Sequence, residues 1–204
     1  NRNEMNNFQN SKEFKEIVNY LNKKNFSKAL EKIQAIYKNY PNDQIILRML
    51  ASIYFNNMDW GKAISYYEKV LFFEKDKSKI LTNIGVAQFK LGKINKSINT
   101  FKIALEYNSN FDLTYNNLGI AYLELAKFED AIKNFSMALK INKKNISAQT
   151  NLINLLTLYK PKKINENPFV KLDKHISNIN IENIYYKKNL KKILNESIKL
   201  INCS

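Results

Sequence analysis

The sequence has very few of the residues on which disulfides, metal clusters and tight turns depend. Its 204 residues include one cysteine, Cys203, one histidine, His175, four glycines and three prolines. A single cysteine excludes an intramolecular disulfide and a cysteine metal cluster, so nothing indicates an oxidising compartment and we expect a cytoplasmic protein. Scarce glycine and proline disfavour a fold built on many tight turns and favour helices.

Long hydrophobic runs and arginines are scarce as well. The longest apolar stretch, residues 45–55, is interrupted by Arg48 and is too short to cross a bilayer. No signal peptide is visible, and because the chain begins at Asn1 rather than at methionine we expect a fragment or a processed form. Arginine, the usual residue for bidentate phosphate contacts, occurs only at Arg2 and Arg48.

The net charge of +15, from 33 Lys and Arg against 18 Asp and Glu, has two open explanations. One is a basic surface for nucleic acid or an anionic membrane, for which the Lys-rich residues 187–199 are the best candidate. The other is a compositional bias in which Lys, Asn and Ile are abundant together. The lysines are spread along the whole chain, which favours bias and speaks against nucleic acid as a partner.

A pattern of small, aromatic and apolar residues recurs every 34 positions. The stretch "TYNNLGIAYLELAKFEDAIKNFSMAL", residues 114–139, aligns with residues 81–105 and, a further 34 back, with residues 47–71. Gly119 falls on Gly85 and then on Ala51. The aromatic of the second half is Phe135, Phe101 and Tyr67 in the three registers. Weaker matches at residues 14–37 and 149–159 extend the pattern in both directions.

The pattern resembles the tetratricopeptide repeat, a helix–turn–helix of 34 residues. The best unit supplies the family's motif positions Tyr115, Leu118, Gly119, Tyr122, Ala131, Phe135 and Ala138. The resemblance implies an all-α fold, a right-handed superhelical solenoid of antiparallel helix pairs with about four to five units. We expect a repeat array over residues 10–159, with units near 10–43, 44–77, 78–111 and 112–145 and a degenerate fifth from 146. Residues 1–9 are expected to fray, and residues 160–204 to form a loop and C-terminal capping helices.

Catalytic and metal-binding constellations are lacking in the sequence. His175 has Asp173 two residues away on a predicted helix, and residues at that spacing do not face each other. There is no glycine-rich phosphate loop, and a mononuclear metal site needs more His or Cys than the chain contains. We therefore expect no enzymatic activity, no cofactor and no metal site.

Asparagines at one repeat position are the strongest binding signal. Asn83, Asn117 and Asn151 stand two residues before the glycine position in three consecutive units. In tetratricopeptide solenoids the first helix of each unit lines an inner groove. The resemblance to the asparagine-ladder groove of O-GlcNAc transferase implies that these amides hold the backbone of an extended peptide. A carboxamide offers both donors and an acceptor for this purpose. The alternative is that Asn is merely the family's consensus residue in an Asn-rich chain.

The predicted groove is otherwise a mixture of apolar and amide side chains. Its further members are Asn116, Arg48, Met49, Phe55, Val86, Phe89, Ile120 and Asn154. The family's other binding mode, a clamp of cations and Asn around an acidic C-terminus, needs cations where Leu113 and Asn117 stand, so we do not expect it.

We predict a non-catalytic scaffold that holds an extended protein or peptide segment, with the N-terminal arm of a larger enzyme as one context. The alternative function is a basic module that binds nucleic acid or an anionic membrane through the Lys-rich C-terminal helix. Self-association through an exposed end of the solenoid is a third possibility.

Overall fold

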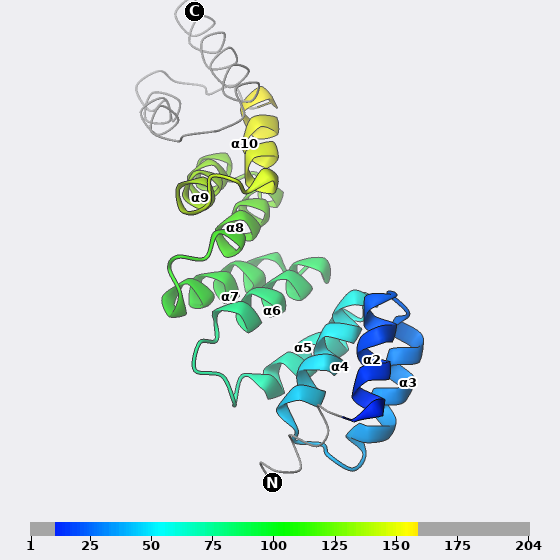
Figure 1. Cartoon of the computed structure of the whole chain (residues 1–204). Helices are drawn as coiled ribbons and strands as arrows, with labels where there is room; N and C mark the ends of the chain where they lie inside the picture. The colour runs from blue at the N-terminus through cyan, green and yellow to red at the C-terminus, as the bar shows by residue number, and fades with distance from the viewer. Residues whose placement is uncertain (1–10, 159–204) are drawn as a thin grey trace, which may run out of the picture. The chain divides into compact units, whose positions relative to one another are not determined.

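The computed structural model describes residues 11–158, and these residues are folded into helices joined by short connections (Figure 1). The helices are α2 (Lys12–Asn22), α3 (Phe26–Tyr37), α4 (Gln44–Asn56), α5 (Trp60–Val70), α6 (Ser78–Lys90), α7 (Ile94–Tyr107), α8 (Asp112–Glu124), α9 (Phe128–Ile141) and α10 (Ile146–Leu158). No strand occurs among residues 11–158, so the all-α prediction is confirmed. The predictions for residues 1–9 and 160–204, which include the capping helices and the Lys-rich segment, lie outside the described residues.

The connections within helix pairs repeat the same backbone conformation every 34 residues. Lys24, Met58, Gly92 and Ala126 each have a positive φ, between 54° and 73°. Only one of the four is a glycine, the residue that adopts this conformation without a steric cost. The turn is therefore imposed by the packing of the helices on either side, and this explains why the turn positions carry little sequence signal.

Side-chain caps fix the start of several helices. Asp43 Oδ1 accepts hydrogen bonds from the backbone N–H groups of Ile45 and Ile46 at 2.9 and 3.0 Å. Asp59 Oδ1 accepts from the backbone N–H of Lys62 at 3.2 Å. Such caps satisfy the donors that the first turn of a helix leaves without a partner, and they define where α4 and α5 begin.

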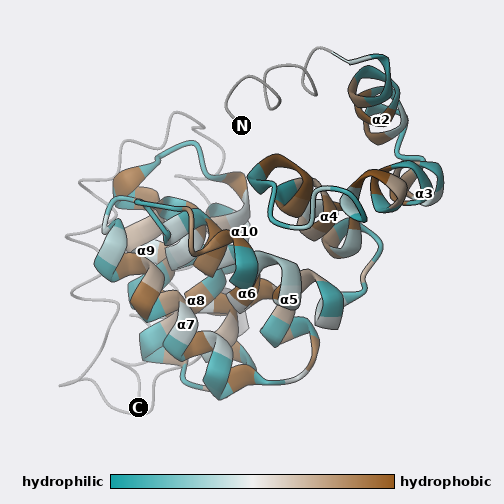
Figure 2. Cartoon of the chain, turned by 90° about the horizontal axis from the view of Figure 1, so that it is seen from below, coloured by the Kyte–Doolittle hydropathy of each residue, from teal (hydrophilic) through white to brown (hydrophobic). Residues whose placement is uncertain are grey.

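The chain divides into two compact units, one ending at Lys96 and the other beginning at Ser97. Unit 1 contains α2 to α6, and in it each of these helices packs on the next one along the chain. Unit 2 contains most of α7 together with α8, α9 and α10; in it α8 packs on α9, and α10 contacts both. Each of α2, α3 and α4 carries both hydrophobic (brown) and hydrophilic (teal) residues, as in an amphipathic helix (Figure 2).

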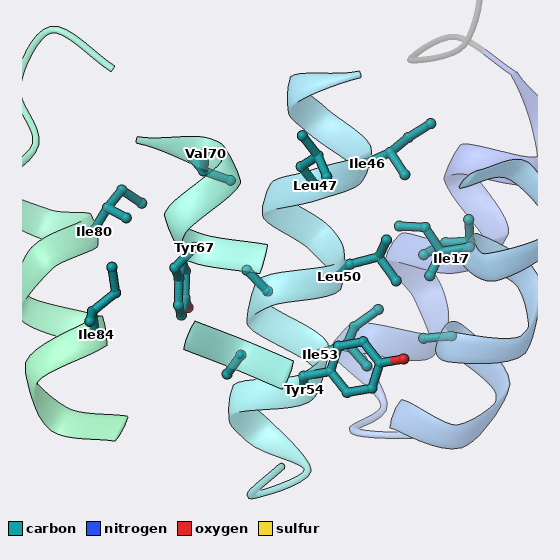
Figure 3. Close-up of a cluster of buried hydrophobic side chains, with 14 residues drawn as sticks. Ile17, Ile46, Leu47, Leu50, Ile53, Tyr54, Tyr67, Val70, Ile80 and Ile84 are labelled. Carbon is teal, nitrogen blue, oxygen red and sulfur yellow. The ribbon is translucent and has the colours of Figure 1, made fainter. Parts of the chain in front are cut away.

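The core of unit 1 consists mainly of buried aliphatic side chains, both large and small. Leu50 of α4 is fully buried, as are Ile17 of α2 and Ile33 of α3. Ala29 and Ala63 are also fully buried, and small residues of this kind let paired helices approach closely. In Figure 3 the side chains of Ile80 and Ile84 point from α6 toward Tyr67 of α5.

The core of unit 2 depends on a close contact between α8 and α9. A Cβ atom placed on Gly119 would lie 2.6 Å from Cε1 and 2.7 Å from Cδ1 of Phe135. Phe135 is completely buried, so displacing its ring would disturb the side chains packed around it. Glycine is therefore required at position 119 by packing and not by backbone conformation. Within the described residues, no helix is long and apolar enough to cross a membrane.

Candidate functional site

Asn83 lies half-buried on α6, where a tyrosine of the preceding helix holds its side chain. Its Nδ2 donates a hydrogen bond of 3.2 Å to Tyr67 Oη on α5. One N–H of the amide is thus used within unit 1, and the carboxamide retains its oxygen and a second N–H for a ligand. Because the amide has a fixed partner, its orientation is set before any ligand binds.

Tyr67 is the residue that sequence reasoning missed. It occupies the aromatic position that Phe101 and Phe135 fill in the next two repeats, and among these three only tyrosine carries a hydroxyl. The side chain is 5% exposed, and burial raises the pKa of Tyr67 to about 12, while the hydrogen bond from Asn83 acts in the opposite direction. The hydroxyl is therefore neutral at physiological pH, and it positions Asn83. The hydroxyl at an otherwise apolar position was the available signal.

Raising the pH above 10 is expected to destabilise unit 1 through ionisation of Tyr67. A folded-state pKa of about 12, above the usual value near 10, means that folding favours the neutral phenol. The resulting stabilisation is complete below pH 10 and declines by up to about 1.4 kcal/mol per pH unit between pH 10 and 12. Urea unfolding across this range should therefore show a smaller alkaline loss for Tyr67→Phe than for the wild type. Tyr40→Phe, at a 51% exposed position, should behave like the wild type.

In unit 2, Asn151 is held by a neighbouring amide. Its Nδ2 on α10 donates to Asn116 Oδ1 on α8 at 3.1 Å. Asn116 is only 5% exposed, which corrects the prediction that it faces a ligand. The physical reason is helix geometry, because adjacent residues point about 100° apart, and position 116 consequently faces α10. Asn116 therefore positions Asn151, as Tyr67 positions Asn83.

Asn117 is the most available of the three amides. It is half-buried on α8 and makes no side-chain hydrogen bond within the described part of the chain. Leu113 and Ile120 stand four residues before and three residues after it, on the same stripe of the helix. Leu113 is 51% exposed and Ile120 is half-buried. We call these three residues the α8 stripe; it offers an unpaired amide between two accessible apolar side chains.

The equivalent stripe on α6 differs at one end, because the exposed Lys79 stands where α8 has Leu113. Val86, three residues after Asn83, is half-buried, and Phe89, three residues further along the helix, is half-buried as well. On α10, Asn154 is exposed three residues after Asn151. Because Asn83 belongs to unit 1 and the other two amides to unit 2, a continuous ladder of three stays a prediction.

The remaining predicted residues on α4 have structural partners. Arg48 forms an ion pair with Glu74 in the connection between α5 and α6. Met49 and Phe55 pack against the core of unit 1, and the ring of Phe55 meets that of Trp60 edge-on at 5.2 Å between centroids. The Arg48–Glu74 pair could not be predicted from the sequence, since Glu74 lies in an irregular connection with no periodic pattern.

The described residues were also compared with the requirements of a metal site. Among residues 11–158, no cluster of three or more His, Cys, Asp or Glu side chains could hold a metal ion. His175 and Cys203 lie outside this part of the chain. The arrangement of the described polar residues suits hydrogen bonding to a ligand.

Comparison with known proteins identifies the repeat. Models of the tetratricopeptide repeat match residues 14–78, 78–111 and 113–145. No curated protein sequence matches the chain.

Solved structures with this fold are similar over much of the chain. The crystal structure of MamA matches with a TM-score of 0.63 and 17% identity, over 89% of this chain and 95% of that one. The structure of pilF from Pseudomonas aeruginosa matches with a TM-score of 0.62 and 18% identity, over 81% and 72%. The first tetratricopeptide domain of Spaghetti (RPAP3), bound to the HSP90 peptide SRMEEVD, has a TM-score of 0.52 and 24% identity, over 55% and 89%.

At these identities the structural likeness shows the fold alone. The tetratricopeptide fold is in general a protein-interaction scaffold. The 34-residue period, the helix pairs and the three repeat matches together show that the chain belongs to the tetratricopeptide repeat family and is an all-α tetratricopeptide solenoid.

Proposed function

We propose that this chain is a non-catalytic scaffold that holds an extended protein or peptide segment against the first helices of its repeats. The observation that carries the proposal is the α8 stripe. An amide with no partner among the described residues stands there between Leu113 and Ile120, both of which are accessible. Asn117 can donate to and accept from a peptide backbone, while the apolar neighbours contact side chains of the bound segment.

The flanking amides support this proposal because they are oriented in advance. Tyr67 fixes Asn83 and Asn116 fixes Asn151, so that binding does not have to order these side chains. Each amide contact contributes about 0.5–1.5 kcal/mol after desolvation. Three such contacts and the burial of two or three apolar side chains would give a complex of roughly micromolar affinity, about −8 kcal/mol.

The charge on α4 and α8 favours a neutral segment over an acidic one, whereas α6 carries the exposed Lys79. Arg48 is already paired with Glu74, and position 113, where an acid-binding clamp needs a cation, carries an exposed leucine. The related domain in complex with SRMEEVD therefore supports peptide binding as a mode and not the same peptide chemistry. Use of the scaffold as the substrate-presenting arm of a larger enzyme in the cytoplasm is compatible with this proposal.

Replacing Asn117 by alanine is expected to weaken peptide binding about two- to tenfold, the loss of one net amide contact. Peptides would first be selected from a displayed random library on the immobilised full chain. The affinity of one selected neutral peptide would then be measured by fluorescence anisotropy. The combined variant Asn83→Ala, Asn117→Ala and Asn151→Ala should lose binding almost completely.

Asn99→Ala is the matched control, because Asn99 is an exposed asparagine on α7, a second helix of its repeat. This variant should bind like the wild type, and circular dichroism would verify that all variants are folded. Failure to select any peptide, or equal affinities of the Asn117→Ala and Asn99→Ala variants, would contradict the proposed function.

A further inference from the structure

The connection between α5 and α6 exposes two adjacent phenylalanines. Phe72 is 89% exposed and Phe73 is 41% exposed. Tyr40, in the connection between α3 and α4, is 51% exposed. Single apolar residues scattered over a protein surface are common, whereas exposed apolar residues that lie together mark interaction sites.

Two contacts place these connections at the same end of unit 1. Lys69 Nζ, in the last turn of α5, donates a hydrogen bond of 3.0 Å to Tyr37 Oη at the end of α3. Arg48, near the start of α4, pairs with Glu74 in the α5–α6 connection. Both connections consequently lie beside the N-terminal end of α4 (Figure 1). We call residues 38–43 together with residues 71–79 the inter-repeat edge.

The acidic side chains of this edge are used within the protein. Asp43 accepts hydrogen bonds from the first turn of α4. Asp76 Oδ1 accepts from the backbone N–H of Ser78 at 2.9 Å, and Glu74 is paired with Arg48. Three acidic groups are thus occupied by backbone donors and by one cation, which leaves little negative charge directed at a partner.

Three lysines of the edge, in contrast, are exposed to solvent. Lys38, Lys75 and Lys79 are exposed and form no ion pair within the described part of the chain. Lys38 lies two residues before Tyr40, Lys75 lies three residues after Phe72, and Lys79 lies in the first turn of α6. Exposed aromatic side chains with exposed lysines close by in sequence are complementary to a surface that is anionic outside and apolar beneath.

We propose that the inter-repeat edge is a docking surface for an anionic lipid membrane, in which Phe72 inserts among the lipids while the lysines contact the headgroups. Lysine binds anionic headgroups as a flexible point charge, and aromatic side chains insert at the boundary between headgroups and acyl chains. Nucleic acid fits less well, because the one arginine of this region, Arg48, is engaged by Glu74. The membrane surface meets the α6 stripe at Lys79, four residues before Asn83, and Phe72, Phe73, Lys38 and Lys75 lie outside the proposed peptide-binding stripes. The proposal does not depend on the proposed function.

Vesicle co-sedimentation of the full chain tests this proposal. Binding is expected to vesicles of phosphatidylcholine with phosphatidylserine, to fall with added salt, and to be absent for phosphatidylcholine alone. Phe72→Ser with Phe73→Ser should weaken binding about tenfold or more. Lys38→Gln, Lys75→Gln and Lys79→Gln together should weaken it about a hundredfold, at about fivefold for each lysine.

Matched controls lie at the opposite end of the helices. Met58, 71% exposed in the α4–α5 turn, can be replaced by asparagine, which tolerates its positive φ. Lys90 and Lys93 are exposed at the α6–α7 turn and can be replaced by glutamine. These control variants should bind vesicles like the wild type. The proposal is overturned if the wild type does not bind anionic vesicles, if the phenylalanine variant binds as well as the wild type, or if the wild type binds polyuridine but not vesicles.

Discussion

Replacing Gly119 by alanine is expected to lower the free energy of unfolding by about 1–3 kcal/mol. In an ordinary helix the same change gains up to about 1 kcal/mol, because glycine has the greater conformational freedom to lose. Here the added Cβ would meet the ring of Phe135 at 2.6 Å, and that ring is completely buried. The sign of the change in a urea titration therefore reports on the close approach of α8 and α9.

Gly61→Ala is the matched control for this prediction. Gly61 lies on α5, and a Cβ built there has no neighbour within 4 Å. The variant should be unchanged or stabilised by up to about 1 kcal/mol. Stabilisation by both substitutions would mean that the α8–α9 packing described here is wrong. In a double-mutant cycle, Gly119→Ala should cost less in a Phe135→Leu background than in the wild type, because the smaller side chain relieves the contact.

Leu50→Ala is expected to cost about 2–5 kcal/mol of stability. Leu50 is fully buried in α4 and points toward α2 and α3 in the centre of the unit 1 core (Figure 3). Truncation removes the buried methyl groups and leaves a cavity that the surrounding aliphatic side chains fill only in part. Chemical unfolding followed by circular dichroism provides the measurement.

Leu91→Ala is the corresponding control, because Leu91 is 42% exposed at the end of α6. A surface truncation of this kind should change the stability by less than about 0.5 kcal/mol. If the two leucine variants lost similar amounts, Leu50 would not be at the centre of a packed core.

The fold could be predicted from the sequence because its main signal is a period. Gly119, Phe135 and their counterparts recur at 34-residue intervals, and no single unit can bury its apolar face alone. Helix starts could be read in part, since Asp43 and Asp59 are good capping residues. Turn positions were harder, because Lys24, Met58 and Ala126 adopt a positive φ without the glycine that usually marks it.

The candidate site could be predicted only at the level of which helix position carries an amide. Whether an amide faces a ligand or a neighbour depends on side-chain pairs that are far apart in sequence. Asn116 and Asn151 are 35 residues apart and form one such pair. Asn83 and Tyr67 form another, and its basis is a hydroxyl at an otherwise apolar position. Repeat periodicity identifies equivalent positions, but it does not show which equivalent residues differ in their partners.

The environments of residues in irregular connections also could not be predicted from the repeat period. Phe72 and Glu74 belong to no helix, so neither amphipathicity nor repeat register predicts their environments. The structure shows that one is in almost complete contact with solvent and that the other pairs with Arg48. This pairing neutralises the one cation that sequence reasoning had placed in the groove.

Nuclear magnetic resonance of the asparagine side chains can show whether the first helices of the repeats hold an extended segment. A selected neutral peptide would be titrated into the labelled full chain, and the Nδ2 resonances of Asn117 and Asn99 would be followed. We expect a saturable shift of the Asn117 resonances, with the Asn99 resonances unchanged. Saturable shifts confined to Asn99 and its neighbours on the second helices, with Asn117 unchanged, would contradict it.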